Sequence, residues 1–149
     1  MTKIFAEILL LVSVAINAAL LVFLAGVLRK VMNDMDDSAF THFVRSLVLH
    51  SKWSPFMETT LNIPAVGAIP YYYFFGFENR WLSAGLALWL AAGLVSKAIK
   101  VPIYKTLETL ERSDAVDLRE LRRKLNVGNV FQASCNTIAT AMIATSLVK

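Results

Sequence analysis

The sequence predicts an all-α fold: an integral membrane, up-and-down four-helix bundle that forms one domain over residues 1–149. Of the 149 residues, 56% are hydrophobic and 17% are charged, whereas ordinary soluble domains are about 25% charged. The apolar residues are also concentrated in four blocks. Each block has close to the roughly 20 residues that a helix needs to cross about 30 Å of hydrocarbon. We therefore expect membrane spans at about 4–28, 54–77, 81–101 and 126–148.

The first apolar block is interrupted only by Glu7, Ser13 and Asn17. Its run of about 25 residues is longer than the 7–15 residues of a signal-peptide core, so we interpret it as a retained helix. Backbone polar groups must pair within the segment when it lies in lipid, which requires a helix here.

The connection at 29–53 predicts an amphipathic helix that lies at the membrane surface. Its N-cap is expected at Asp37 or Ser38, the residue types that favour this position. Apolar residues follow at helical spacing: Phe40, Phe43, Val44, Leu47 and Val48. His42 and His50 lie about on one face of this helix. Two histidines are too few for a His-rich site, so we interpret them as solvated residues and predict no metal.

The second block, "SPFMETTLNIPAVGAIPYYYFF", is apolar enough to span a membrane but contains prolines. Pro64 and Pro70 each lack an N–H, which leaves the carbonyls near Thr60 and Val66 without their helical donors. In lipid these carbonyls need other partners. We expect the partners to be Thr59, Thr60 or amides of the last span. The alternative is that the prolines only bend the helix.

The third block is uncharged until Lys97, and the fourth block has no charge. The connection at 97–125 contains leucines at helical spacing. Asp114 is expected to cap a helix that continues into the fourth block, with Asp117 in its first turn. The third and fourth helices should therefore extend well beyond the membrane.

Basic residues predict the orientation. The two long connections contain twelve Lys and Arg residues, and the opposite side has only Lys3, Arg80 and Lys149. This asymmetry places the long connections in the cytoplasm and both termini outside, in a bacterial-type inner membrane. Eleven acidic residues offset the basic ones, and most lie among them. We therefore expect the lipid bilayer, and no nucleic acid, as a partner.

Polar residues within the blocks predict a site. Glu58 lies about one turn inside the cytoplasmic boundary, and Asn62 lies one turn deeper on the same face. Polar side chains that face lipid are costly, so they should turn inward and meet. We expect a pocket in the cytoplasmic half of the bundle that binds an apolar or aromatic small molecule, with Glu58 as the candidate catalytic residue. The predicted binding residues are Asn17, Asn62, Lys97, Asn129, Gln132 and Asn136.

The same residues allow a structural interpretation. Glu58 would then pair with Lys97 or Lys100, or extend toward the boundary, and the amides would join helices by hydrogen bonds. The protein would be a non-catalytic accessory subunit of a larger membrane complex, or a homo-oligomer. A transporter is disfavoured because the sequence has no inverted repeat. Cys135 is alone, so no internal disulfide is expected.

The order of these features resembles the anthrone-oxygenase-like family of small four-helix membrane proteins. The shared features are a long first helix, a Phe within the polar first connection (Phe40 or Phe43), and Pro55 at the start of the second helix. Two further segments match the pattern, "VPIYKTLE" at the end of the third helix and "ELRRKLNVGNVFQ" before the last. The family tends to have Asn after the proline of the third-helix motif, where this chain has Ile103. It also usually has a Trp before the final arginines, which this chain lacks.

The resemblance implies oxidation of an aromatic polyketide anthrone without metal or flavin, and hence no cofactor. Glu58 would act as the base on an acidic carbon or hydroxyl of the substrate. Asn62, Asn129 and Gln132 would stabilise the oxyanion that forms.

Overall fold

A computed structural model gives the structure of the chain and describes residues 2–52, 54–109 and 117–148, with only the backbone described at 52, 56–58 and 61. The described residues form helices and no strand, which confirms the all-α prediction. In chain order the elements are α1 (Lys3–Phe23), the π-helix η1 (Leu24–Leu28), α2 (Arg29–Asp34), α3 (Asp37–Lys52), α4 (Pro55–Phe75), α5 (Arg80–Thr109) and α6 (Leu118–Ser146).

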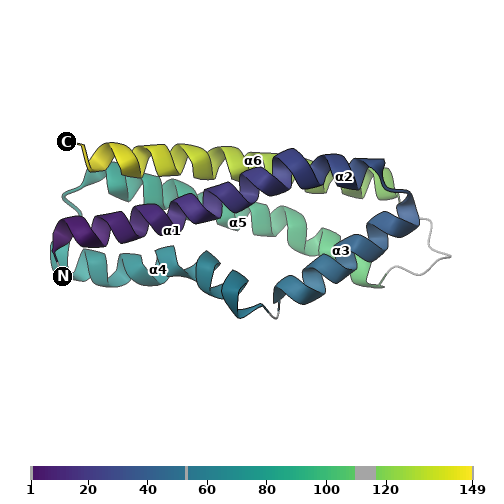
Figure 1. Ribbon diagram of the computed structural model, residues 1–149, viewed down its shortest axis with the longest axis horizontal. Coiled ribbons are helices and arrows are strands. Elements are labelled where there is room, and N and C mark those ends of the chain that lie inside the picture. Colours follow the sequence, from purple (N-terminus) through teal and green to yellow (C-terminus); the bar gives the residue numbers. More distant parts are fainter. Residues whose placement is uncertain (1, 53, 110–116, 149) are drawn as a thin grey trace.

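The first three elements form one continuous helix from Lys3 to Asp34. The long helices run alternately up and down, and both termini lie at the same end of the molecule (Figure 1). Helix α6 packs along α5 and also along α1, whereas α4 packs mainly against α1. The arrangement therefore has a well-packed α1–α5–α6 unit with α4 at its edge.

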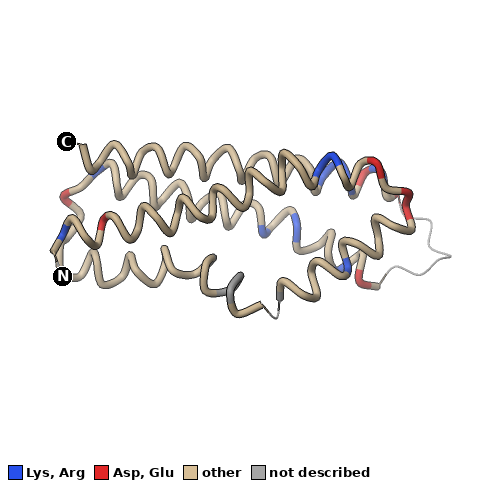
Figure 2. The backbone as a smooth tube through the Cα atoms, in the orientation of Figure 1, with Lys and Arg blue, Asp and Glu red and all other residues tan. Residues whose placement is uncertain are grey.

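Two helices of the described chain, Lys3–Asp34 and Arg80–Thr109, are long and apolar enough to cross a membrane, by length and composition. Most charged residues of the described chain lie in the half of the molecule that holds α2 and α3, with a few at the end that holds the termini (Figure 2). The sequence predicted four spans, and membrane crossing by α4 and α6 stays a prediction.

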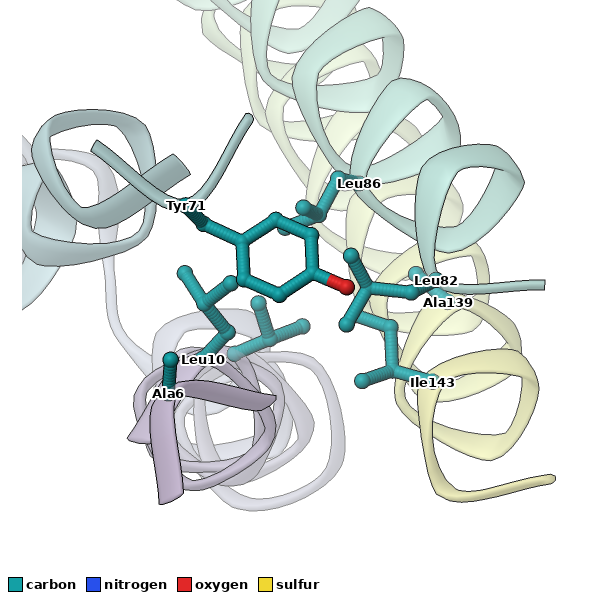
Figure 3. Close-up of a cluster of buried hydrophobic side chains, with 8 residues drawn as sticks. Ala6, Leu10, Tyr71, Leu82, Leu86, Ala139 and Ile143 are labelled. Atoms are coloured by element: carbon teal, nitrogen blue, oxygen red, sulfur yellow. The ribbon is translucent and has the colours of Figure 1, made fainter. Parts of the chain in front are cut away.

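A hydrophobic core lies near the end with the termini, which we call the outer end. The Tyr71 side chain lies between α1 and the α5–α6 pair, and is almost fully buried (Figure 3). Helices α5 and α6 approach closely here. A Cβ on Gly85 would lie 2.6 Å from Ile143 Cγ1 and 2.9 Å from the Ala139 carbonyl oxygen, so only glycine fits at this contact.

A second hydrophobic core lies at the opposite, inner end. Phe40 and Val44 of α3 are fully buried there, beside residues of α2, α5 and α6: Met32, Ile103, Leu107 and Leu125. The structure confirms that 37–52 is a helix with an apolar face. Most of that face is buried within the protein, because α5 and α6 extend far enough to cover it, while Leu47 stays exposed.

Two helix caps differ from the expected ones by a few residues. The Asp36 carboxylate accepts the Ala39 N–H at 2.7 Å, so Asp36 caps α3 in place of Asp37 or Ser38. Asp117 caps α6 by accepting the N–H groups of Arg119 and Glu120. Asp114, the predicted cap, lies outside the described residues. The cap position depends on where the chain turns, and several adjacent Asp and Ser residues are chemically equivalent for this role.

Candidate functional site

Asn17 joins α1 to α4 in the middle of the bundle. Its Nδ2 donates to the Thr60 carbonyl at 2.7 Å and to the Ser13 carbonyl at 3.0 Å. The Thr60 carbonyl lacks its helical donor because Pro64 has no N–H. The predicted need for a partner at Thr60 is therefore confirmed. The predicted identity of the donor to the Thr60 carbonyl was wrong, because the donor is Asn17 of α1 and not a residue of α4 or α6.

Gln132 joins α6 to α5. Its Oε1 accepts hydrogen bonds from Ser96 Oγ and from Lys100 Nζ, both at 2.7 Å. Ser96 and Lys100 are buried, and the exposed Lys97 does not take part in this cluster. Among the described side chains, the partner of the Lys100 ammonium is thus the neutral amide of Gln132.

The remaining predicted residues do not converge on one point. Asn129 and Asn136 are buried on α6, and Asn136 Oδ1 has no hydrogen-bond partner among the described residues. Asn62 is exposed on α4. Glu58 belongs to α4, but its side chain lies outside the described part of the chain, so its role as a base stays a prediction. Of the predicted site residues, Asn17 and Gln132 thus link neighbouring helices, Asn17 to α4 and Gln132 to α5.

A buried carboxylate at the outer end was missed. Glu7 Oε1 accepts hydrogen bonds from the Tyr71 hydroxyl at 2.7 Å and from Asn79 Nδ2 at 3.1 Å. Asn79 Oδ1 in turn accepts the Leu82 N–H. These bonds tie α1, α4 and the start of α5 together. An acidic residue inside an apolar block indicates a buried polar site. The position of Glu7 within the first apolar block could therefore have predicted this one.

A cleft of about 640 Å³ opens between α2 and the first turns of α6. This volume lies within the range of about 300–1,000 Å³ that is typical of ligand sites. Its lining combines four arginines, one aspartate and two asparagines with an apolar floor: Arg29, Asn33, Asp37, Arg119, Arg122, Arg123, Asn126, Val127, Val130 and Phe131. We call it the arginine cleft.

A second cavity of about 520 Å³ continues from the arginine cleft along the bundle, between η1 and α6. The two share Arg29 and Val130. Apart from Arg29, the lining is small and mostly apolar: Val22, Ala25, Gly26, Val130, Ala133, Ser134, Thr137 and Ile138. We call it the apolar groove. The π-helical turn contributes Ala25 and Gly26, and such turns occur frequently at functional sites.

The arginines of the cleft are not equivalent. Arg122 donates to the carbonyls of Asn33 and Met35 and to the Asp37 carboxylate, and its guanidinium lies over the Phe40 ring. It therefore fixes the α2–α3 turn against α6. Arg122 Nε is buried and has no partner among the described residues.

Arg123 is engaged by Glu120 through two hydrogen bonds of 2.9 and 3.0 Å. These bonds lower the pKa of the Glu120 carboxyl. Arg29 and Arg119, by contrast, have no side-chain hydrogen bond or ion pair within the described part of the chain. Among the described residues, neither Arg29 nor Arg119 is therefore paired with an acidic side chain.

The fold and these cavities define a helical protein with two candidate membrane-spanning helices and an amphipathic cleft at its inner end. Comparisons with protein-family models, curated proteins and solved structures gave no match. The resemblance to the anthrone-oxygenase-like family therefore stays a prediction, and function has to be inferred from the residues of this chain.

Proposed function

We propose that this chain is a multi-pass inner-membrane protein that binds an apolar small molecule, which enters from the bilayer at the inner end of the bundle. Two helices with the length and apolar composition of membrane spans support the first part. Helices α4 and α6 run beside them (Figure 1). The described basic residues of both long connections lie in the half of the molecule that holds the inner end (Figure 2), which the positive-inside rule assigns to the cytoplasmic side.

The apolar groove is the observation that carries the binding proposal. It lies between the first and last helices, and its lining side chains are small and mostly uncharged. A Cβ placed on Gly26 meets no atom within 4 Å, so the glycine leaves open space. In a membrane a groove of this kind faces the acyl chains, and an apolar molecule reaches it laterally. Asn129 and Asn136, which the sequence predicted to bind the ligand, lie on the same helix as the groove-lining residues.

Mass spectrometry of the intact protein, isolated from its own membranes in a gentle detergent, tests this proposal. We expect a bound small molecule on the unmodified protein. Gly26→Phe should remove it, because the ring occupies the groove. Gly93→Phe is the matched control, since Gly93 also lies in a long helix with no atom within 4 Å of an added Cβ but does not line the groove. A protein that carries no molecule, or one that Gly26→Phe does not affect, would contradict the proposal.

A structural subunit is the second candidate. Helix α4 has an exposed apolar face at the edge of the bundle, where Ile69, Tyr73 and Phe74 are 73%, 82% and 72% exposed. A partner helix in the membrane would cover such a face as readily as lipid does. A stoichiometric protein complex from native membranes, lost in Ile69→Asn and unaffected by Gly26→Phe, would favour this function.

A further inference from the structure

We propose that the molecule in the apolar groove is an acidic glycerophospholipid, with its phosphate in the arginine cleft and one acyl chain in the groove. The inference rests on the proposed function and specifies the ligand of that same site. Its first support is continuity. Arg29 and Val130 line both cavities, so a headgroup site leads directly into a chain site.

Charge is the second support. The cleft has four arginines and one aspartate in its lining. Arg122 is held by Asp37 and by two carbonyls, and Arg123 is held by Glu120. Arg29 and Arg119 remain available. They belong to different helices of the lining, since Arg29 is at the start of α2 and Arg119 is in the first turn of α6.

The chemistry of guanidinium groups fits a phosphate better than a carboxylate here. A guanidinium binds phosphate oxygens through paired N–H donors. The walls contribute further polar groups that an extended headgroup can use, since Asn33 and Asn126 also line the cleft. A small apolar molecule without a charged group would leave both free arginines unused.

Depth and length agree with a lipid of the cytoplasmic leaflet. Arg29 directly follows the long apolar segment, so the proposed membrane topology puts it near the depth of the lipid phosphates. The helix segment from Val22 to Arg29 rises about 10 Å, and the groove follows it. One leaflet is about 15 Å of hydrocarbon. The groove therefore accommodates the part of an acyl chain nearest the headgroup and leaves the chain end in the bilayer.

The test uses three lipids with identical acyl chains: phosphatidylglycerol, phosphatidylcholine and diacylglycerol. Each is added to the delipidated full-length protein, and binding is measured by mass spectrometry of the intact complex and by titration in detergent. We expect the order phosphatidylglycerol, then phosphatidylcholine, then diacylglycerol. The double variant Arg29→Gln/Arg119→Gln should weaken phosphatidylglycerol binding by about tenfold or more, because hydrogen bonds to charged groups are lost.

Lys30→Gln/Lys105→Gln is the matched control. It removes the same charge from the same end of the molecule, and both lysines are exposed and outside the cleft. Equal losses in the two double variants would overturn the inference, because the effect would then be general attraction to an acidic surface. The inference would also be overturned if millimolar inorganic phosphate displaced the lipid and bound to the protein in the absence of lipid. The ligand would then be a soluble phosphate.

The two proposals fail separately. One outcome is that all three lipids bind equally, that Arg29→Gln/Arg119→Gln has no effect, and that Gly26→Phe abolishes binding. In that case the headgroup inference is wrong and the proposed function stands. If none of the three lipids binds and native membranes yield no bound molecule, both are wrong.

Discussion

The outer and inner ends of the bundle share α5, α6 and the continuous α1–α2 helix, with α4 at the outer end and α3 at the inner end, but they differ in how completely they are filled. At the outer end, Tyr71 fills the space between helices, Gly85 allows close contact, and Glu7 has two hydrogen-bond donors. At the inner end there are two cavities, and two arginines that have no acidic partner among the described residues. A protein tolerates empty space and unpaired charge at a cost, so the inner end is where we place binding and the outer end is where we place stability.

The largest expected effect tests the packing difference directly. Gly85→Leu should lower the free energy of unfolding by about 3 kcal/mol or more, at the upper end for overpacking, because the new side chain meets the Ala139 carbonyl oxygen as well as Ile143. Gly26→Leu should have no such cost, since nothing lies within 4 Å of its added Cβ. Unfolding in mixed detergent micelles measures both. Equal losses would remove the distinction between the two ends.

The next effect compares a satisfied polar group with an unsatisfied one. Tyr71→Phe removes one of the two donors to the buried Glu7 carboxylate and should cost about 1–3 kcal/mol. Arg29→Gln should change stability by about 0.5 kcal/mol or less, because the side chain has no partner to lose. Tyr73→Phe, at an 82% exposed position, controls for the loss of a hydroxyl. If Arg29→Gln lowers the free energy of unfolding as much as Tyr71→Phe does, the Arg29 guanidinium has a structural role.

A smaller effect concerns the region between the ends. Asn17→Val should cost about 0.6–1.7 kcal/mol, the range measured for hydrogen bonds between membrane helices, because the Thr60 carbonyl loses its donor. Adding Pro64→Ala restores a backbone N–H that can donate to Thr60 within α4. The double variant should therefore recover part of the loss, as measured by the same unfolding assay. Additive losses in the two variants would show that Asn17 acts by packing alone.

The smallest effect lies on the surface of the inner end. The pKa of Glu120 is lowered by its hydrogen bonds to Arg123. Its contribution to stability is therefore present above its unfolded pKa and is lost as the pH falls through the lower folded pKa. Glu120→Gln should slightly reduce the loss of Tm on acidification, whereas the exposed Glu108→Gln should not. A steeper acid dependence in Glu120→Gln would reverse the sign and contradict the assignment.

Helices were predictable from this sequence, and their mutual rotation was not. Apolar blocks of sufficient length identified all the long helices, and the spacing of Phe40 and Val44 identified α3 with its apolar face. Proline chemistry also predicted that the Thr60 carbonyl needs a partner. The donor was missed because it depends on which face of α1 meets α4, and sequence periodicity does not specify the pairing of faces.

The arginine cleft was missed for a related reason. Its residues come from α2 and α6, about 90 positions apart in the chain, and no local pattern connects them. The π-helical turn adds to the difficulty. One extra residue in a helical turn rotates all later residues about the helix axis by about 100°. Ordinary helical spacing counted from Asn17 therefore assigns Arg29 to the wrong face of the helix.

The order of synthesis gives the contact between Asn17 and Thr60 another role. A chain emerges from the ribosome with its N-terminus first, so in the proposed membrane topology α1 would enter the bilayer before α4 is complete. Helix α4 contains two internal prolines, Pro64 and Pro70, and is a poor candidate for insertion on its own. It meets in α1 a donor already in place for the carbonyl that Pro64 leaves open. In that topology α4 is expected to insert only in a chain that already carries α1.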